Sequence, residues 1–234
     1  MGFSLYRLDA FYNAALVPAA VELLGSGLPD SLKAMYKAFV DRYPAIGPEA
    51  FKTTNPNSLA EVGIVITPIP NKLEITFRVD QITANAVNLT VEETRLAQDC
   101  AMLAANTAGR FSESSLGACT MRLSTWLKVD GGLPTVDALL AQTSEPKDRR
   151  FQPRWMGAEQ IRYTPRLDLV NISEGWRLNV SAEPSAIPGA DLFLSRNYSF
   201  ESGGRLGSVE QQIAFMDHSM TVLVEWLGIG PYEA

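Results

Sequence analysis

Hydrophobic and polar residues alternate along several short segments of the chain. The alternation is clearest in residues 73–79 and 176–180, where leucine, isoleucine, valine or an aromatic residue occupies every second position. Successive side chains of a strand point to opposite faces, so this period of two predicts strands with one buried face. Each of these strands follows another across a short turn, and a third is expected after it. The additional strands are predicted at residues 63–67, 84–89, 166–170 and 191–200.

Two longer segments have the signals of capped helices. Thr90 stands three residues before Glu93, and Ser208 stands three residues before Gln211. In such a capping box, each side chain satisfies a free backbone N–H of the other residue. The pattern predicts helices that begin after Thr90 and after Ser208, the second extending to Leu227. Apolar residues at helical spacing predict a further helix at residues 30–43.

The two capped helices resemble each other, and so do the segments before them. Identical residues recur 118 positions apart at Val91 and Val209, Glu92 and Glu210, Asp99 and Asp217, and Met102 and Met220. Residues 5–8 resemble 120–123, and residues 16–24 resemble the helix-like segment 133–140. The shared order is strand, helix, antiparallel strands, long helix. We therefore expect an internally duplicated α+β fold, with helices on one face of a mostly antiparallel sheet. The repeats would span residues 1–117 and 118–234, as two domains or merged into one.

Composition and charge narrow the function classes. The 234 residues are 46% hydrophobic and 20% charged, which is typical of a globular protein. The net charge of -6 argues against a general attraction to nucleic acid or anionic membranes. No apolar stretch reaches the roughly 18 to 20 residues that a membrane-spanning helix needs, and no secretory signal is evident. We expect a cytoplasmic protein that does not enter a membrane.

The supply of metal-binding side chains is small. The chain has one histidine and two cysteines, without the spacing of a zinc site, so neither a metal nor a cofactor is expected. Cys100 and Cys119 lack neighbouring basic residues that would activate a thiol, and we interpret both as buried small hydrophobic residues.

The C-terminal helix provides one candidate ligand site. His218 is the only histidine, and it lies on a partly apolar side of this helix. We predict a ligand-binding wall there, in a crevice beneath the helix, made of Phe215, His218, Val222 and Trp226. The competing interpretation is that His218 is a structural or surface residue, and this is the one that we favour.

A second candidate is a segment rich in basic and aromatic residues between positions 145 and 166. Interleaved cations and aromatic rings can pair with phosphates and stack on bases. The predicted anion-binding residues are Lys147, Arg149, Arg150, Arg154 and Trp155. The alternative, a solvated loop whose arginines pair locally, is the interpretation that we favour.

No catalytic motif stands out, so the sequence favours a non-catalytic binding or scaffold protein. We expect it to dimerise or bind a protein partner through an open sheet face or a crevice. One alternative is a small-ligand-binding protein or hydrolase that uses the apolar crevice beside the C-terminal helix. Another is an anion- or nucleic-acid-binding protein that uses residues 147–166.

Overall fold

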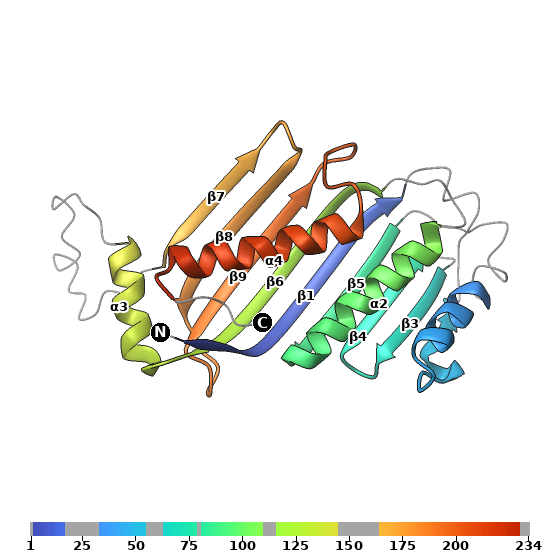
Figure 1. The fold of residues 1–234 in the computed structure, drawn as a ribbon, viewed down its shortest axis with the longest axis horizontal. Coiled ribbons are helices and arrows are strands. Elements are labelled where there is room, and N and C mark those ends of the chain that lie inside the picture. Colours follow the sequence, from blue (N-terminus) through green and yellow to red (C-terminus); the bar gives the residue numbers. More distant parts are fainter. Residues whose placement is uncertain are drawn as a thin grey trace.

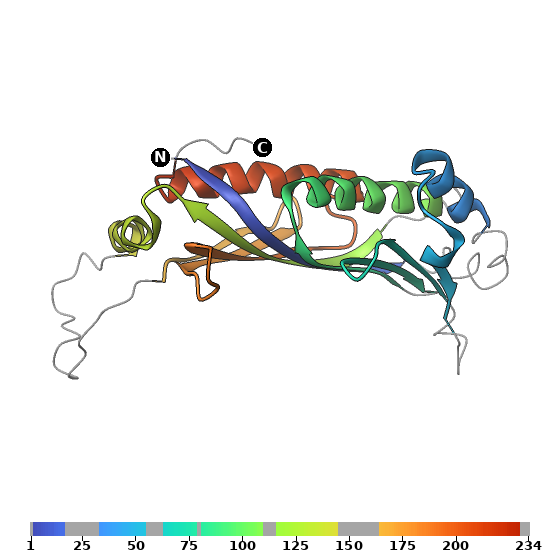
Figure 2. The same cartoon turned by 90° about the horizontal axis from the view of Figure 1, so that it is seen from below.

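One antiparallel sheet forms the body of the protein, and helices lie on one of its faces (Figures 1 and 2). The computed structural model describes residues 2–16, 33–54, 63–78, 81–109, 116–144 and 164–229. Within these residues nine strands occur in the order β2-β3-β4-β5-β1-β6-β9-β8-β7. Their bounds are Phe3–Leu16 (β1), Phe51–Thr53 (β2), Gly63–Ile69 (β3), Leu73–Arg78 (β4), Gln81–Leu89 (β5), Leu116–Val129 (β6), Arg166–Asn171 (β7), Trp176–Pro184 (β8) and Leu192–Phe200 (β9).

The centre of the sheet is the pair formed by β1 and β6. Each has 14 residues, and they pair antiparallel from Phe3 opposite Val129 to Leu16 opposite Leu116. On one side β1 is followed by β5, β4 and β3, and on the other β6 is followed by β9, β8 and β7. The strands of the two sequence halves are therefore arranged in the same order. A common origin of the halves remains a prediction, and the proposed boundary at residue 117 falls inside β6.

Two long helices, α2 (Val91–Gly109) and α4 (Val209–Trp226), cover the same face of the sheet (Figure 1). Both begin with the predicted capping box. The Thr90 N–H donates to Glu93 Oε2 at 2.9 Å, and the Glu93 N–H donates to Thr90 Oγ1 at 3.4 Å. The same reciprocal pair joins Ser208 and Gln211 at 3.2 Å in both directions. These bonds satisfy backbone donors that the first helical turn leaves free.

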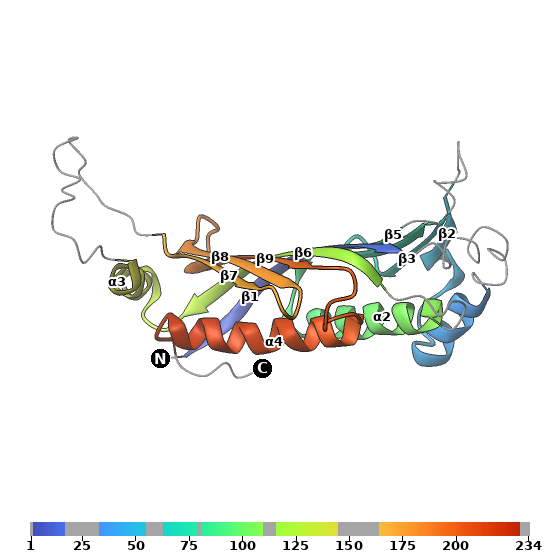
Figure 3. The same ribbon diagram turned by 90° about the horizontal axis from the view of Figure 1, so that it is seen from above.

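Two shorter helices lie at the ends of the sheet (Figures 1 and 3). One is α3 (Gly132–Ser144), which follows β6, and the other spans residues 33–42. Val136 and Leu140 of α3 pack into a core cluster with Leu127 of β6 and Val224 of α4. Phe39, on the helix at the opposite end, belongs to the larger cluster beneath α2. The hydrophobic core therefore lies between the helices and a single face of the sheet.

The alternation within the strands explains this arrangement. Leu192 and Leu194 of β9 are buried towards the helices, whereas Ser195 and Asn197 point to the other face. Because side chains alternate, one face of the sheet packs against α2 and α4 and the other carries mostly polar residues. Figure 2 shows this second face without a covering helix.

The structure confirms the predicted fold class, with helices on one face of an antiparallel α+β sheet. The long helices and the helical residues 33–42 also agree with the sequence patterns. Strands β1 and β6 are much longer than the segments 5–8 and 120–123 that suggested them, and the edge strand β2 was not predicted. The helix expected at 16–24 falls almost entirely outside the described residues. No helix in the described part of the chain is long and apolar enough to span a membrane.

Candidate functional site

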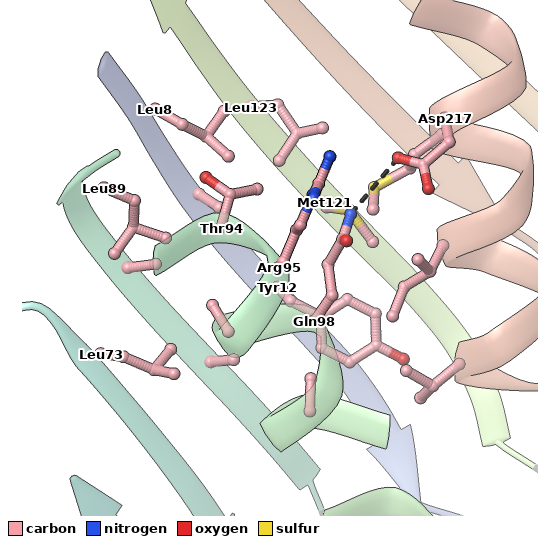
Figure 4. Close-up of a pocket in the computed structure, with 18 of the residues that line it drawn as sticks. Leu8, Tyr12, Leu73, Leu89, Thr94, Arg95, Gln98, Met121, Leu123 and Asp217 are labelled. Carbon is pink, nitrogen blue, oxygen red and sulfur yellow. Dashed lines mark hydrogen bonds between the residues drawn. The ribbon is translucent and has the colours of Figure 1, made fainter. Parts of the chain in front are cut away.

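A cavity of about 520 Å³ lies between α2, α4 and the centre of the sheet (Figure 4). Its floor is formed by side chains from five neighbouring strands, β4, β5, β1, β6 and β9. Its walls come from both long helices, between Val91 and Ala105 on α2 and between Val209 and Thr221 on α4. Residues far apart in the sequence thus meet at one place, over the strand pair that joins the two halves.

Small side chains keep this space open. Alanines line it at positions where a larger residue would fill the volume, namely Ala10, Ala84, Ala86, Ala97, Ala101 and Ala105. Larger apolar side chains complete the lining, among them Leu8, Leu73, Ile75, Met121, Leu123, Ile213 and Met216. A lining of this kind favours an apolar ligand, because the removal of apolar surface from water stabilises the complex.

Polar side chains gather where the cavity reaches solvent. Arg95 of α2 and Asp217 and His218 of α4 are exposed, and Gln98 of α2 is half-buried. Gln98 Nε2 donates to Asp217 Oδ1 at 3.3 Å and so connects the two helices. Desolvation raises the pKa of the Asp217 carboxyl above its usual value, against the opposing effects of the Gln98 hydrogen bond and the Arg196 charge.

The inner lining contains one buried cation, Arg196 of β9. Only 5% of this residue is exposed. Its Nη2 donates to Thr125 Oγ1 at 3.1 Å and its Nη1 donates to Tyr198 Oη at 3.3 Å, while Nε has no partner. No acidic side chain of the described residues lies within ion-pair distance of it. A buried charge without a counter-ion is costly, so this residue requires an explanation.

Neighbouring hydroxyl groups fix the position of this guanidinium. Tyr198 is almost fully buried, and its Oη shares a hydrogen bond of 2.7 Å with Ser219 Oγ of α4. Ser219 Oγ in turn donates to the Met216 carbonyl at 2.9 Å. These hydrogen bonds connect Arg196 through Tyr198 to Ser219 of α4, and they hold the cation beneath this helix.

At another part of the lining, Tyr12 of β1 has a buried hydroxyl group with no hydrogen-bond partner of acceptable geometry. Burial raises its pKa, so the hydroxyl stays protonated. It lies near the thiol of Cys119, which accepts a hydrogen bond from Gln212 Nε2 at 3.0 Å. Figure 4 shows Tyr12 among the apolar side chains of the cavity.

Both cysteines are buried and free, as predicted. Burial raises the pKa of the Cys100 thiol to about 12. Burial also raises the pKa of the Cys119 thiol, although its hydrogen bonds lower it in part. Neither is therefore suited to act as a nucleophile near neutral pH.

Of the four residues predicted to form the ligand-binding wall, His218 lines the cavity and the other three do not. Phe215 packs against Trp176, with ring centroids 4.8 Å apart. Val222 is exposed, and Trp226 packs partly buried beside both core clusters. The cavity is lined instead by the side of α4 that carries Ile213, Met216 and Met220.

The predicted anion-binding residues, Lys147, Arg149, Arg150, Arg154 and Trp155, lie outside the described residues. Within the described part of the chain, no group of three or more His, Cys, Asp or Glu side chains could hold a metal ion.

Arg196 was missed at the sequence level, although a signal was present. In the alternating segment 191–200, it occupies the same phase as Leu194 and Tyr198. A charged residue at an inward position of a strand indicates a buried charge, and buried charges are rare without a partner or a function. The alanines gave no such signal, because alanine is common in helices and cores alike.

The fold and this cavity define the protein as a single-sheet α+β protein with a central, mainly apolar cavity. No protein-family model matches the chain, and no curated protein matches it significantly. A solved structure that does match is that of the rolling circle replication initiator protein from Geobacillus stearothermophilus. The match covers 96% of this chain and 85% of that chain, with a TM-score of 0.37 and 11% sequence identity. At these values it assigns no residue role here.

The sequence-based prediction of a non-catalytic scaffold is corrected here: the solved structure that matches the chain is named for replication initiation and not for a scaffold role, and a match this weak carries no role over to this chain. The prediction rested on the absence of catalytic motifs and on an expected uncovered sheet face. A cavity assembled from separate strands and helices leaves no motif in the sequence, so the absence of motifs carried less weight than we gave it.

Proposed function

We propose that the protein binds a small, largely apolar molecule in the cavity between α2, α4 and the centre of the sheet. The observation that carries this proposal is the cavity itself, about 520 Å³ in volume and lined mainly by aliphatic side chains. Small-molecule sites span roughly 300 to 1,000 Å³ and combine apolar walls with a few polar groups. The lining here has this composition.

The contrast with ordinary packing supports the proposal. Protein interiors are close-packed, with few voids larger than a water molecule. Elsewhere between the helices and the sheet, large side chains such as Leu178, Leu192 and Leu194 are almost fully buried. Alanines on β1, β5 and α2 maintain a space at the centre. The self-association and cytoplasmic location expected from the sequence stay predictions.

The test is binding of a neutral fluorescent probe, N-phenyl-1-naphthylamine, whose emission rises in apolar surroundings. We expect a saturable rise with the wild-type chain. Ala101→Phe places a ring in the cavity and should abolish it. Ala214→Phe is the matched control, because Ala214 is exposed on α4 and does not line the cavity.

Circular dichroism would establish that both variants keep the fold. Absence of saturable binding to the wild-type chain would contradict the proposal. Equal binding by Ala101→Phe would also contradict it, because the probe would then occupy another site.

A further inference from the structure

Arg196 carries an inference about the chemistry of the ligand. It is the one charged residue of the lining that is buried, whereas Arg95, Asp217 and His218 are at the solvent-exposed edge. A guanidinium has five N–H donors and no acceptor. Two hydrogen bonds are made, to Thr125 and Tyr198, which leaves the Nε–H and one N–H on each Nη available.

We propose that the cavity takes an amphiphile with a single carboxylate, and that the carboxylate pairs with Arg196 while the apolar tail extends over the alanines towards β4. This inference rests on the proposed function, because it requires the cavity to be a ligand site. It goes further in naming the head group, the residue that recognises it and the direction in which the ligand lies.

The direction follows from the order of the strands. Arg196 is on β9, at one side of the cavity floor, and Leu73 and Ile75 are on β4, at the other side. Four strand spacings of roughly 4.8 Å separate β9 from β4, a span of about 19 Å. The intervening lining from β6, β1 and β5 is apolar apart from Thr125 beside Arg196 and the hydroxyl of Tyr12. One charged end and a long apolar remainder fit a medium-chain alkyl carboxylate.

The choice of a carboxylate follows from the charge and shape of the guanidinium. A planar guanidinium matches a carboxylate with parallel N–H···O bonds, and such charge-assisted bonds are about twice as strong as neutral ones. A single buried cation balances one negative charge. A dianionic phosphate would leave excess charge in the apolar lining, which is costly. Asp217 interacts electrostatically with Arg196, but it stays at the exposed edge, beyond ion-pair distance.

The experiment compares dodecanoate with 1-dodecanol, which shares the chain length and lacks the charge. Each would compete with N-phenyl-1-naphthylamine for the wild-type 234-residue chain at pH 8. We expect dodecanoate to bind about 10- to 100-fold more tightly than 1-dodecanol, which corresponds to the lower end of the coupling energies of close charge pairs. Arg196→Met should remove that preference, and Arg196→Lys should restore part of it.

Arg122→Met is the matched control. Arg122 is an exposed residue of β6 that does not line the cavity, so its loss should leave the preference for dodecanoate in place. The comparison of dodecanoate with 1-dodecanol on the wild-type chain needs no variant. Equal affinities there would overturn the role of Arg196 even if Arg196→Met fails to fold.

The outcomes separate the two proposals. Equal affinities for dodecanoate and 1-dodecanol, with probe binding intact, would overturn the role of Arg196 and leave the cavity as a ligand site. A preference for dodecanoate that survives in folded Arg196→Met would also overturn it. Failure of the probe and of both amphiphiles to bind would overturn the proposed function, and this inference with it.

Discussion

Gln98 of α2 and Asp217 of α4 are joined by a hydrogen bond of 3.3 Å, from Gln98 Nε2 to Asp217 Oδ1, at the solvent-exposed edge of the central cavity (Figure 4). The two residues lie 119 positions apart in the sequence, and they connect the long helices of the two halves. One partner is a carboxylate whose pKa is raised by desolvation, so its protonation is coupled to folding.

Asp217→Asn should alter how stability depends on pH. Desolvation raises the pKa of Asp217 in the folded state, so the folded protein binds this proton more tightly than the unfolded chain does. Its contribution is greatest below the unfolded pKa of roughly 3.9 and is lost as the pH rises through the higher folded pKa. The free energy of unfolding of Asp217→Asn, relative to wild type, should therefore increase as the pH rises across that window.

Urea denaturation at several pH values would measure this difference. Asp99→Asn removes an exposed carboxylate at the equivalent position of α2 and serves as the matched control. A constant difference between wild type and Asp217→Asn at all pH values would show that the carboxylate is not desolvated in solution.

Glu93 should have the opposite pH dependence. Hydrogen bonds from Lys72 and from the Thr90 backbone lower the pKa of Glu93 in the folded state. The stability that it contributes is present above the unfolded pKa of roughly 4.3 and is lost as the pH falls through the lower folded pKa. Glu93→Ala, which loses both the cap and the ion pair, should cost about 1 kcal/mol at pH 7.

Glu93→Gln separates the two effects. Glutamine keeps the capping geometry, as Gln211 does in α4, but it cannot form the ion pair with Lys72. It should cost less than Glu93→Ala, because partly exposed ion pairs contribute little. Thermal unfolding at pH 7 and pH 3 would check both variants, and a Glu93→Gln deficit that persists at low pH would contradict this account.

The capping boxes show what the sequence could predict. A cap depends on residues three positions apart, so Thr90 with Glu93 and Ser208 with Gln211 were recognisable without the fold. The strands were also predictable, because alternation is local. The cavity depends on the side-chain sizes of residues such as Ala84 and Ala101, which meet only after β5 and α2 have packed. No local pattern distinguishes these alanines from others.

The cavity is lined by a different side of α4 from the one predicted, for a related reason. Apolar residues occur on several sides of this helix, because it contacts the sheet, the cavity and the aromatic side chains of β8 and β9. Helical spacing identified the apolar residues of α4 but not which part of the fold each of them contacts. Phe215 therefore packs against Trp176 and not into the cavity, whereas Ile213 and Met216 line the cavity.

Tyr198→Phe should destabilise the protein by about 1 to 3 kcal/mol, the range for leaving buried polar groups without a partner. Tyr198 is almost fully buried, and its hydroxyl accepts a bond from Arg196 and shares one with Ser219. The phenyl ring would still stack on Phe200. Tyr36→Phe is the control, because Tyr36 is exposed and should tolerate the change. Equal unfolding midpoints in urea for the two variants would argue against the buried network.

The two cysteines should resist modification while the protein is folded. Thiolates are the reactive form, and burial raises the pKa of Cys100 to about 12 and also raises that of Cys119. Ellman's reagent at pH 8 should therefore react slowly with the native chain, at a rate limited by opening of the structure, and quickly with both thiols in guanidinium. Ser173→Cys, at an exposed turn, should add one fast-reacting thiol and confirm that the reagent is active.

Fast reaction of a thiol in the native wild-type chain would show that the helix-sheet interface around Cys100 or Cys119 opens readily. The cavity beside them would then be a transient space and not a fixed one.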